Sequence, residues 1–271
     1  MMFITNEVRI AKIAESATVD IIFIDLEVNG KNVRQANMDT VKSSHTISDV
    51  SNMKNILSTS KLLVRINPLY EGTQLEIDEV ISRGADIVML PMFQTTADVV
   101  KFVDIVNGRA QTMLLVETIE AEKSISQISA MSGINTIHIG LNDLHIAHNK
   151  TFMFELLTDG NVERMRKHIM RYEISYGFGG IAKLDEGMLP ARSIIAEHYR
   201  LGSTQTILSR SFCNTSDLFD YDEIEEQFEN GMKAIREFEC QLPLLSNEFF
   251  ANNRNDVIER VKAIVYSKRG A

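Results

Sequence analysis

Two acidic residues follow apolar, Val- and Ile-rich segments at a matched spacing. Glu117 comes after the run TMLLV, Asp143 comes after TIHIGLN, and 26 positions separate the two. If these segments are neighbouring strands of a parallel sheet, both carboxylates project from the same edge. Carboxylates suit Mg²⁺ or Mn²⁺, and a site with two of them leaves positions for water and substrate. The pair predicts a divalent-metal site, with helix-capping or solvated acids as the alternative.

Charged and polar residues also end two earlier apolar runs. Asp25 and Glu27 close the segment IIFIDLE, and Arg65 and Asn67 close KLLVRIN. An arginine guanidinium can bind a carboxylate with two hydrogen bonds or stabilise charge on an enolate oxygen. We therefore expect Arg65 to contact substrate, to pair with one of the two acids, or to do both. Asn67 either hydrogen-bonds the substrate or caps the turn at Pro68.

These residues need elements that bring them together. Short apolar segments recur with room for a helix between them, which is typical of alternating strands and helices. Their hydrophobicity is nearly continuous, as in a parallel sheet buried on both faces. No glycine-rich phosphate-binding turn follows the first strands, so the pattern favours an α/β fold of the (β/α)₈ TIM-barrel type over an open doubly wound sheet. The expected strands are 2–5, 19–25, 61–66, 86–91, 112–117, 135–140, 178–182 and 204–209.

The chain is longer at its C-terminal end than barrel closure requires. Residues 1–220 should form the barrel, which is the catalytic domain if the acids act together, and 221–271 a C-terminal helical extension with helices near 221–239 and 253–267. Between the second and third strands, 29–49 is polar and lacks a clean helical period. Active sites of such barrels lie at the C-terminal ends of the strands, so we expect a long loop there on the catalytic face.

Composition excludes several classes of function. The formal net charge is −9 and no Lys/Arg cluster occurs, which argues against a nucleic-acid partner. Charged residues interrupt the N-terminal segment 1–20, and no apolar run approaches the length of a membrane span. We therefore predict a soluble, cytoplasmic protein with no membrane partner. Cys213 and Cys240 stand in no paired motif and are interpreted as packing residues.

Five segments, in order along the chain, resemble the characteristic blocks of the HpcH/HpaI aldolase and citrate lyase beta-subunit family. The resemblance covers residues 19–145, and DLE followed by RINP is most similar to the citrate lyase beta-like branch. The segments are FIDLE at 23–27, VRINP at 64–68, GADIVMLP at 84–91, VET at 116–118 and GLNDL at 140–144.

The resemblance implies roles for particular residues. Glu117 and Asp143 become the ligands of Mg²⁺ or Mn²⁺, and Arg65 becomes the arginine that binds substrate and stabilises charge. Backbone amides near Asn142 and Asp143 would hold a substrate carboxylate, and Asn67 is a further candidate for substrate binding.

The resemblance also implies a reaction and an assembly. The reaction is that of a carbon–carbon lyase or aldolase that acts through a metal-bound enolate of a small 2-oxo acid such as pyruvate or oxaloacetate. An acyl-CoA lyase or thioesterase of the citrate lyase beta-like type is the alternative, and a non-catalytic binding or assembly barrel is another. Related barrels lead us to expect a homo-oligomer, a trimer or hexamer, in which the C-terminal helices pack on a neighbouring subunit.

The sequence departs from the family pattern at two positions. Val28 stands where the pyruvate aldolases have a histidine of their acid/base machinery, so the proton carrier is open between His45, Glu27 and a metal-bound water. Met92 stands where the citrate lyase-like branch commonly has a lysine. We expect either a surface position for His45 or one that reaches back over the barrel mouth.

Three further histidines lie in or near the sixth apolar segment. His138 alternates with isoleucines and is predicted to be a packed core residue. His145 and His148 follow Asp143 and are either solvated or support a metal site from outside its ligand shell.

Overall fold

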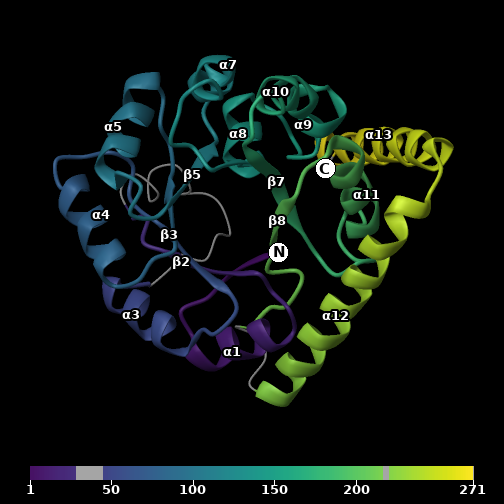
Figure 1. Cartoon of the computed structure of the whole chain (residues 1–271). Coiled ribbons are helices and arrows are strands. Elements are labelled where there is room, and N and C mark those ends of the chain that lie inside the picture. Colours follow the sequence, from purple (N-terminus) through teal and green to yellow (C-terminus); the bar gives the residue numbers. More distant parts are fainter. Residues whose placement is uncertain (29–44, 216–219, 271) are drawn as a thin grey trace.

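Parallel strands pair in chain order and close into a barrel, which confirms the predicted (β/α)₈ fold (Figure 1). The structure is a computed structural model and describes residues 1–28, 45–215 and 220–270. The barrel closes where Met2 of the first strand pairs with Ile207 of the last. The strands of the described chain are β1 (Met2–Ile4), β2 (Ile21–Asp25), β3 (Lys61–Arg65), β4 (Ile87–Leu90), β5 (Gln111–Val116), β6 (Thr136–Ile139), β7 (Ser175–Ile181) and β8 (Gln205–Leu208).

The predicted strands coincide with the observed ones apart from shifts at their ends, and the largest shift is in β7. This strand begins at Ser175, whereas the sequence predicted a start at 178. The reason is the close approach of Gly177 to β8, because a Cβ at this position would lie 2.1 Å from the Gln205 carbonyl oxygen. Glycine has low strand propensity, so its use for close packing hid the start of the strand from the sequence pattern.

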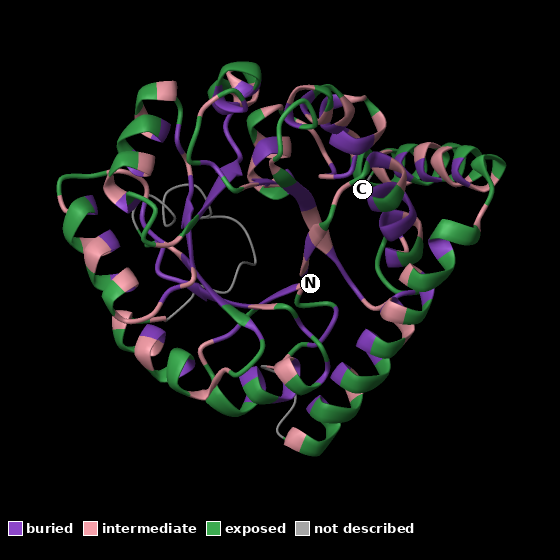
Figure 2. Ribbon diagram, viewed as in Figure 1, coloured by how far each residue is buried: buried purple, intermediate pink, exposed green. Residues whose placement is uncertain are grey.

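The strand side chains fill two separate cores, which explains why the apolar runs were continuous. One set forms a cluster inside the barrel, and the other belongs to the larger core shared with the surrounding helices. Most strand residues are therefore buried (Figure 2). The inward-facing cluster consists of Met2, Phe23, Leu63, Ile87, Met89, Met113 and Leu115.

Helices surround the barrel and turn exposed faces outward (Figure 2). In the described parts of the chain, none of them is both long and apolar enough to cross a membrane. The helices that follow the strands are α1 (Val8–Ser16), α3 (Ile47–Ile56), α4 (Thr73–Ser82), α5 (Thr96–Val106), α6 (Ile119–Lys123), α7 (Ile125–Ile128), α8 (Leu141–Ala147), α9 (Glu155–Thr158), α10 (Asn161–Ile169) and α11 (Ala191–Leu201).

The C-terminal extension forms two long helices, α12 (Tyr221–Gln241) and α13 (Asn247–Arg269), joined by the short 3₁₀ turn η1 (Leu242–Leu244). The second helix starts six residues earlier than 253, because Ser246 caps it by accepting a hydrogen bond from the Phe249 N–H. Helix α12 packs on α1 and α11, and α13 packs on α11 and α9 of the same chain (Figure 1). The additional packing of this extension on a neighbouring subunit stays a prediction.

Two histidines are buried in the protein interior. His138 lies inside the barrel, as predicted, with Nε2 3.2 Å from the Gly179 carbonyl oxygen. The ring of His198, on α11, stacks on Phe178 at a centroid distance of 3.7 Å, and its Nδ1 lies 2.6 Å from Ser203 Oγ. Burial lowers the pKa of His138 to about 4 and that of His198 to about 3.

The pKa of His198 predicts a loss of stability in mild acid. An unfolded histidine titrates near pH 6.5, so between that pH and about 3 the unfolded chain binds a proton that the folded state excludes. The contribution of His198 is complete above pH 6.5 and falls with pH by up to about 1.4 kcal/mol per unit. In His198→Asn, whose amide can keep the contact with Ser203, urea unfolding between pH 7 and 5 should show a shallower loss of stability than in the wild type.

The difference between the two proteins isolates His198, because other titrating groups contribute to both. An exposed acid replaced in the same way, Glu229→Gln on α12, serves as the control and should retain the wild-type slope between pH 7 and 5. Equal slopes for the wild type and His198→Asn would contradict the assignment of a neutral, buried His198.

Candidate active site

An ion pair joins the C-terminal ends of β2 and β3. Arg65, the last residue of β3, donates from Nε and Nη2 to the two carboxylate oxygens of Asp25, the last residue of β2, each at 2.8 Å. Glu27 lies on the same side, with Oε2 3.4 Å from Arg65 Nε. Both acids are buried. The predicted pairing of Arg65 with a strand-two acid is therefore present, and it involves both of them.

Arg65 stays charged in this environment. Burial alone would lower its pKa, but the charge and hydrogen bonds of Asp25, followed by the charges of Glu27 and Glu117, raise that pKa above the usual value. Arg65 Nη1 makes no hydrogen bond to a described residue. The guanidinium is thus held in one orientation from one side and keeps donors for a further anionic group.

Glu117 follows β5 directly and is buried, with only 4 % of its surface exposed. Its Oε1 accepts a hydrogen bond of 3.0 Å from the backbone N–H of Met92. Burial raises the pKa of Glu117 to about 8, and the charges of Asp143 and Glu27 act in the same direction, whereas Arg65 and the Met92 N–H act against them. Among the described charges that act on Glu117, two are negative and one is positive.

Asp143 lies in the first turn of α8, and its charge acts on Glu117. The start of α8 approaches Glu117 at Gly140, where a Cβ would lie 3.1 Å from Glu117 Cβ and 3.2 Å from Glu117 Oε2. Asn142, one residue before Asp143, is exposed. The two predicted metal-binding carboxylates thus follow paired strands, β5 and β6, and interact electrostatically.

The two carboxylates fit a hard divalent cation. Within the described ranges no group of three or more His, Cys, Asp or Glu side chains gathers as a metal site. Mg²⁺ commonly takes only one or two protein carboxylates and keeps its other positions for water and substrate. Burial, followed by the charges of Asp143 and Glu27, raises the pKa of Glu117 to about 8, and a bound cation would stabilise its ionised form.

His45 lies beside the ion pair, although it stands twenty positions after Asp25 in the chain. Its Nδ1 accepts a hydrogen bond of 2.9 Å from the backbone N–H of Asp25. This contact assigns the proton of the neutral ring to Nε2. Of the two expectations for His45, the one in which it reaches back to the mouth agrees with this position. Of the predicted long loop, 29–44 lies outside the described residues.

Both ends of the Asn67 side-chain amide form hydrogen bonds within the protein. Its Oδ1 accepts a hydrogen bond of 2.9 Å from the Val28 N–H, and its Nδ2 donates to Glu76 Oε1 at 2.8 Å. Glu76, in the first turn of α4, was missed at the level of sequence because an acid there is typical of any helix start. In the sequence, Met92 was considered only because the related enzymes have a lysine there. In the structure its backbone N–H donates to Glu117, and its backbone adopts a left-handed φ of 53°.

The remaining histidines form no metal cluster with Asp143. His145 Nδ1 lies 3.2 Å from the Leu141 carbonyl oxygen, a contact within its own helix. His148 pairs through Nε2 with Glu122 on α6. Both side chains therefore serve local packing of α8 and its neighbours.

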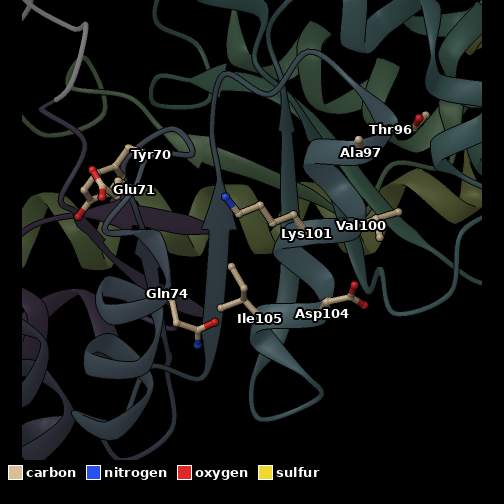
Figure 3. A pocket seen from close by; sticks show the side chains of 9 residues that line it. All are labelled: Tyr70, Glu71, Gln74, Thr96, Ala97, Val100, Lys101, Asp104 and Ile105. Atoms are coloured by element: carbon tan, nitrogen blue, oxygen red, sulfur yellow. The ribbon is translucent and has the colours of Figure 1, made fainter.

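A groove of about 670 Å³ lies on the outer wall between α4 and α5 (Figure 3). Tyr70 and Glu71 line it at the end nearer the barrel mouth, and Lys101 on α5 extends toward them (Figure 3). Arg65, Glu117 and Asp143 are not part of its lining, so the groove is separate from the charged cluster.

Comparisons with known proteins agree with the resemblance found in the sequence. The family model described as HpcH/HpaI aldolase/citrate lyase matches residues 1–152, more than half of the chain. No curated protein sequence matches the chain.

Solved structures share the fold at low sequence identity. An HpcH/HpaI aldolase from Desulfitobacterium hafniense DCB-2 has a TM-score of 0.60 at 16% identity, with 87% of this chain and 92% of that chain covered. A HpcH/HpaI aldolase/citrate lyase family protein from Burkholderia cenocepacia J2315 has a TM-score of 0.60 at 12% identity, covering 88% and 93%. Macrophomate synthase has a TM-score of 0.56 at 13% identity, covering 77% and 76%. With the match of the family model, the chain belongs to the HpcH/HpaI aldolase/citrate lyase family, whose members are aldolases and lyases.

Proposed function

We propose that this protein is a divalent-metal-dependent carbon–carbon lyase or aldolase that acts through the enolate of a small 2-oxo acid. One observation carries the proposal: the buried carboxylate of Glu117, directly after β5, interacts with the charges of both Arg65 and Asp143. Membership of the family supports a reaction of the aldolase or lyase class.

Glu117 and Asp143 would hold Mg²⁺ or Mn²⁺. When bound, the cation supplies a Lewis acid that polarises the carbonyl group of the oxo acid. The Met92 N–H fixes one oxygen of Glu117 and so limits the directions in which this carboxylate can serve as a ligand. The low exposure of Glu117 limits bulk water around the reacting group.

Arg65 would orient the substrate and stabilise the charge that develops on the enolate oxygen. Asp25 holds two nitrogens of the guanidinium, so the remaining donors are preorganised and need no rearrangement during the reaction. In cleavage, a base takes the proton of the substrate hydroxyl, whose oxygen becomes the carbonyl oxygen of the departing aldehyde or ketone. The C–C bond breaks, its electron pair forms the enolate, and a proton then converts the enolate to the oxo acid.

Two side chains are the proposed proton carriers in place of the histidine that Val28 replaces. Glu27 is buried beside Arg65, and His45 is held against the backbone of Asp25 with its proton assigned to Nε2. We favour His45, since a histidine exchanges protons near neutral pH. Glu27 is committed to the same charge network that keeps Arg65 in place.

The first test is deuterium exchange of the pyruvate methyl group, followed by NMR with Mg²⁺ or Mn²⁺. The wild type should exchange these protons only with metal present, and Glu117→Gln and Arg65→Lys should slow exchange by about 100-fold or more, as for loss of a preorganised electrostatic group. Glu120→Gln, an exposed acid three residues beyond Glu117, is the matched control and should keep the wild-type rate.

Exchange without metal, or unaffected by both substitutions, would overturn the proposed site. Metal binding without methyl exchange would favour the alternative function, an acyl-CoA lyase or thioesterase. Absence of metal binding by the wild type would favour a binding or assembly barrel.

A second test separates the proton carrier from the metal ligands. His45→Gln should slow methyl exchange by about 10²-fold, in the range for loss of a general acid–base group, while Mn²⁺ binding measured by electron paramagnetic resonance stays at the wild-type affinity. His168→Gln on α10 provides the control, because that residue lies on an outer helix. Wild-type exchange in His45→Gln would transfer the role to Glu27.

A further inference from the structure

We propose that Glu76 is a positioning residue, which acts through Asn67 to hold the segment that carries Glu27 beside Arg65. The inference deepens the proposed function, and its test by enzyme activity rests on that function. Its test by amide hydrogen exchange does not depend on the reaction.

Glu76 determines which way the amide of Asn67 points. Glu76 Oε1 accepts two hydrogen bonds from Asn67, one of 3.1 Å from the backbone N–H and one of 2.8 Å from Nδ2. A carboxylate can only accept hydrogen bonds, so the NH₂ end of the amide must face Glu76 and the carbonyl end must face the other way. The hydrogen bonds therefore identify which end of the Asn67 amide is the oxygen and which is the nitrogen.

The side-chain carbonyl of Asn67 accepts a hydrogen bond from the segment that follows β2. Asn67 Oδ1 accepts the N–H of Val28 at 2.9 Å, and Asp25 Oδ1 accepts the N–H of Glu27 at 3.2 Å. Two successive backbone N–H groups around Glu27 are thus fixed by side chains. The Glu27 carboxylate consequently lies 3.4 Å from Arg65 Nε, where its charge contributes to holding the guanidinium.

Burying a carboxylate at position 76 costs stability, so packing alone would favour an apolar residue there. Glu76 Oε2 is buried, and the Tyr70 hydroxyl interacts with this carboxylate. Burial raises the pKa of Glu76, and burial followed by the charge of Glu76 raises the pKa of the nearby Tyr70 hydroxyl. An apolar residue would avoid the cost of burying a carboxylate, but it would remove the acceptor that the Asn67 N–H and Nδ2 share.

Tyr70 places this chain of contacts at the surface. Its ring covers the start of α4, where a Cβ on Gly72 would come within 2.5 Å of it, and it also lines the groove between α4 and α5 (Figure 3). The contacts therefore run from the rim of the barrel through Glu76 and Asn67 to Glu27.

The structural test is hydrogen exchange of the Val28 amide, measured by NMR on the whole protein. Glu76→Ala and Asn67→Ala should each speed exchange of this amide by about tenfold, the order expected for loss of one net hydrogen bond. Glu76→Gln should preserve the wild-type rate, since its Oε1 can still accept both bonds from Asn67. Glu79→Ala, a half-exposed acid on the same helix, is the matched control.

Val28 protection that is unchanged in Glu76→Ala would overturn the proposal, because Asn67 would then hold its orientation unaided. Faster exchange in Glu79→Ala as well would also overturn it, because the effect would belong to α4 in general. The amide is read without any substrate, so this result stands whether or not the protein acts on pyruvate.

The activity test is a double-mutant cycle on methyl exchange. Glu76→Ala and Asn67→Ala should each slow the exchange at saturating pyruvate about tenfold and leave the half-saturating concentration unchanged, since neither side chain contacts substrate in this account. The double variant should be no slower than Asn67→Ala, because both changes break one chain of contacts. Additive losses would contradict the proposal, and a wild type with no exchange would count against the proposed function alone.

Discussion

An ion pair between the ends of β2 and β3 holds the charged cluster at the barrel mouth together. Arg65 donates from two nitrogens to Asp25 and lies 3.4 Å from Glu27, and its charge also acts on Glu117. Each of these buried charges would be costly alone, so pairing with Arg65 stabilises the described groups of the cluster. Burial raises the pKa of Glu117 to about 8, and a bound cation would stabilise its ionised form.

The backbone is adapted to bring these groups together. Gly140 lets α8 begin against Glu117, and Met92 turns through a left-handed conformation with its N–H on the same carboxylate. Backbone strain and close approach of this kind persist where the surrounding structure constrains the local conformation, which is common at functional sites. The apolar layers inside and outside the strands supply the rigidity against which such positions are held.

Around the charged cluster, side chains from distant segments fix one another by hydrogen bonds. His45 reaches the backbone of Asp25, and Glu76 reaches the exit of β2 through Asn67. The hydrogen bonds of Asn67 thus join the segment after β2 to α4, a role that neither of the two expectations for this residue included. Such contacts orient the groups that act on a substrate and limit their motion.

Local pattern in the sequence determined the fold class and the principal residues of the site. Nearly continuous apolar runs predict strands buried on both faces, and the residues that end those runs, Arg65, Glu117 and Asp143, must then meet at one end of a parallel barrel. The start of β7 was missed, because glycines that pack closely have no apolar signature. Only the tertiary structure decided that Arg65 pairs with both strand-two acids, that His45 returns to Asp25, and that Glu76 orients Asn67. These contacts join residues between nine and forty positions apart, and their geometry depends on barrel closure and loop paths that no short-range periodicity encodes.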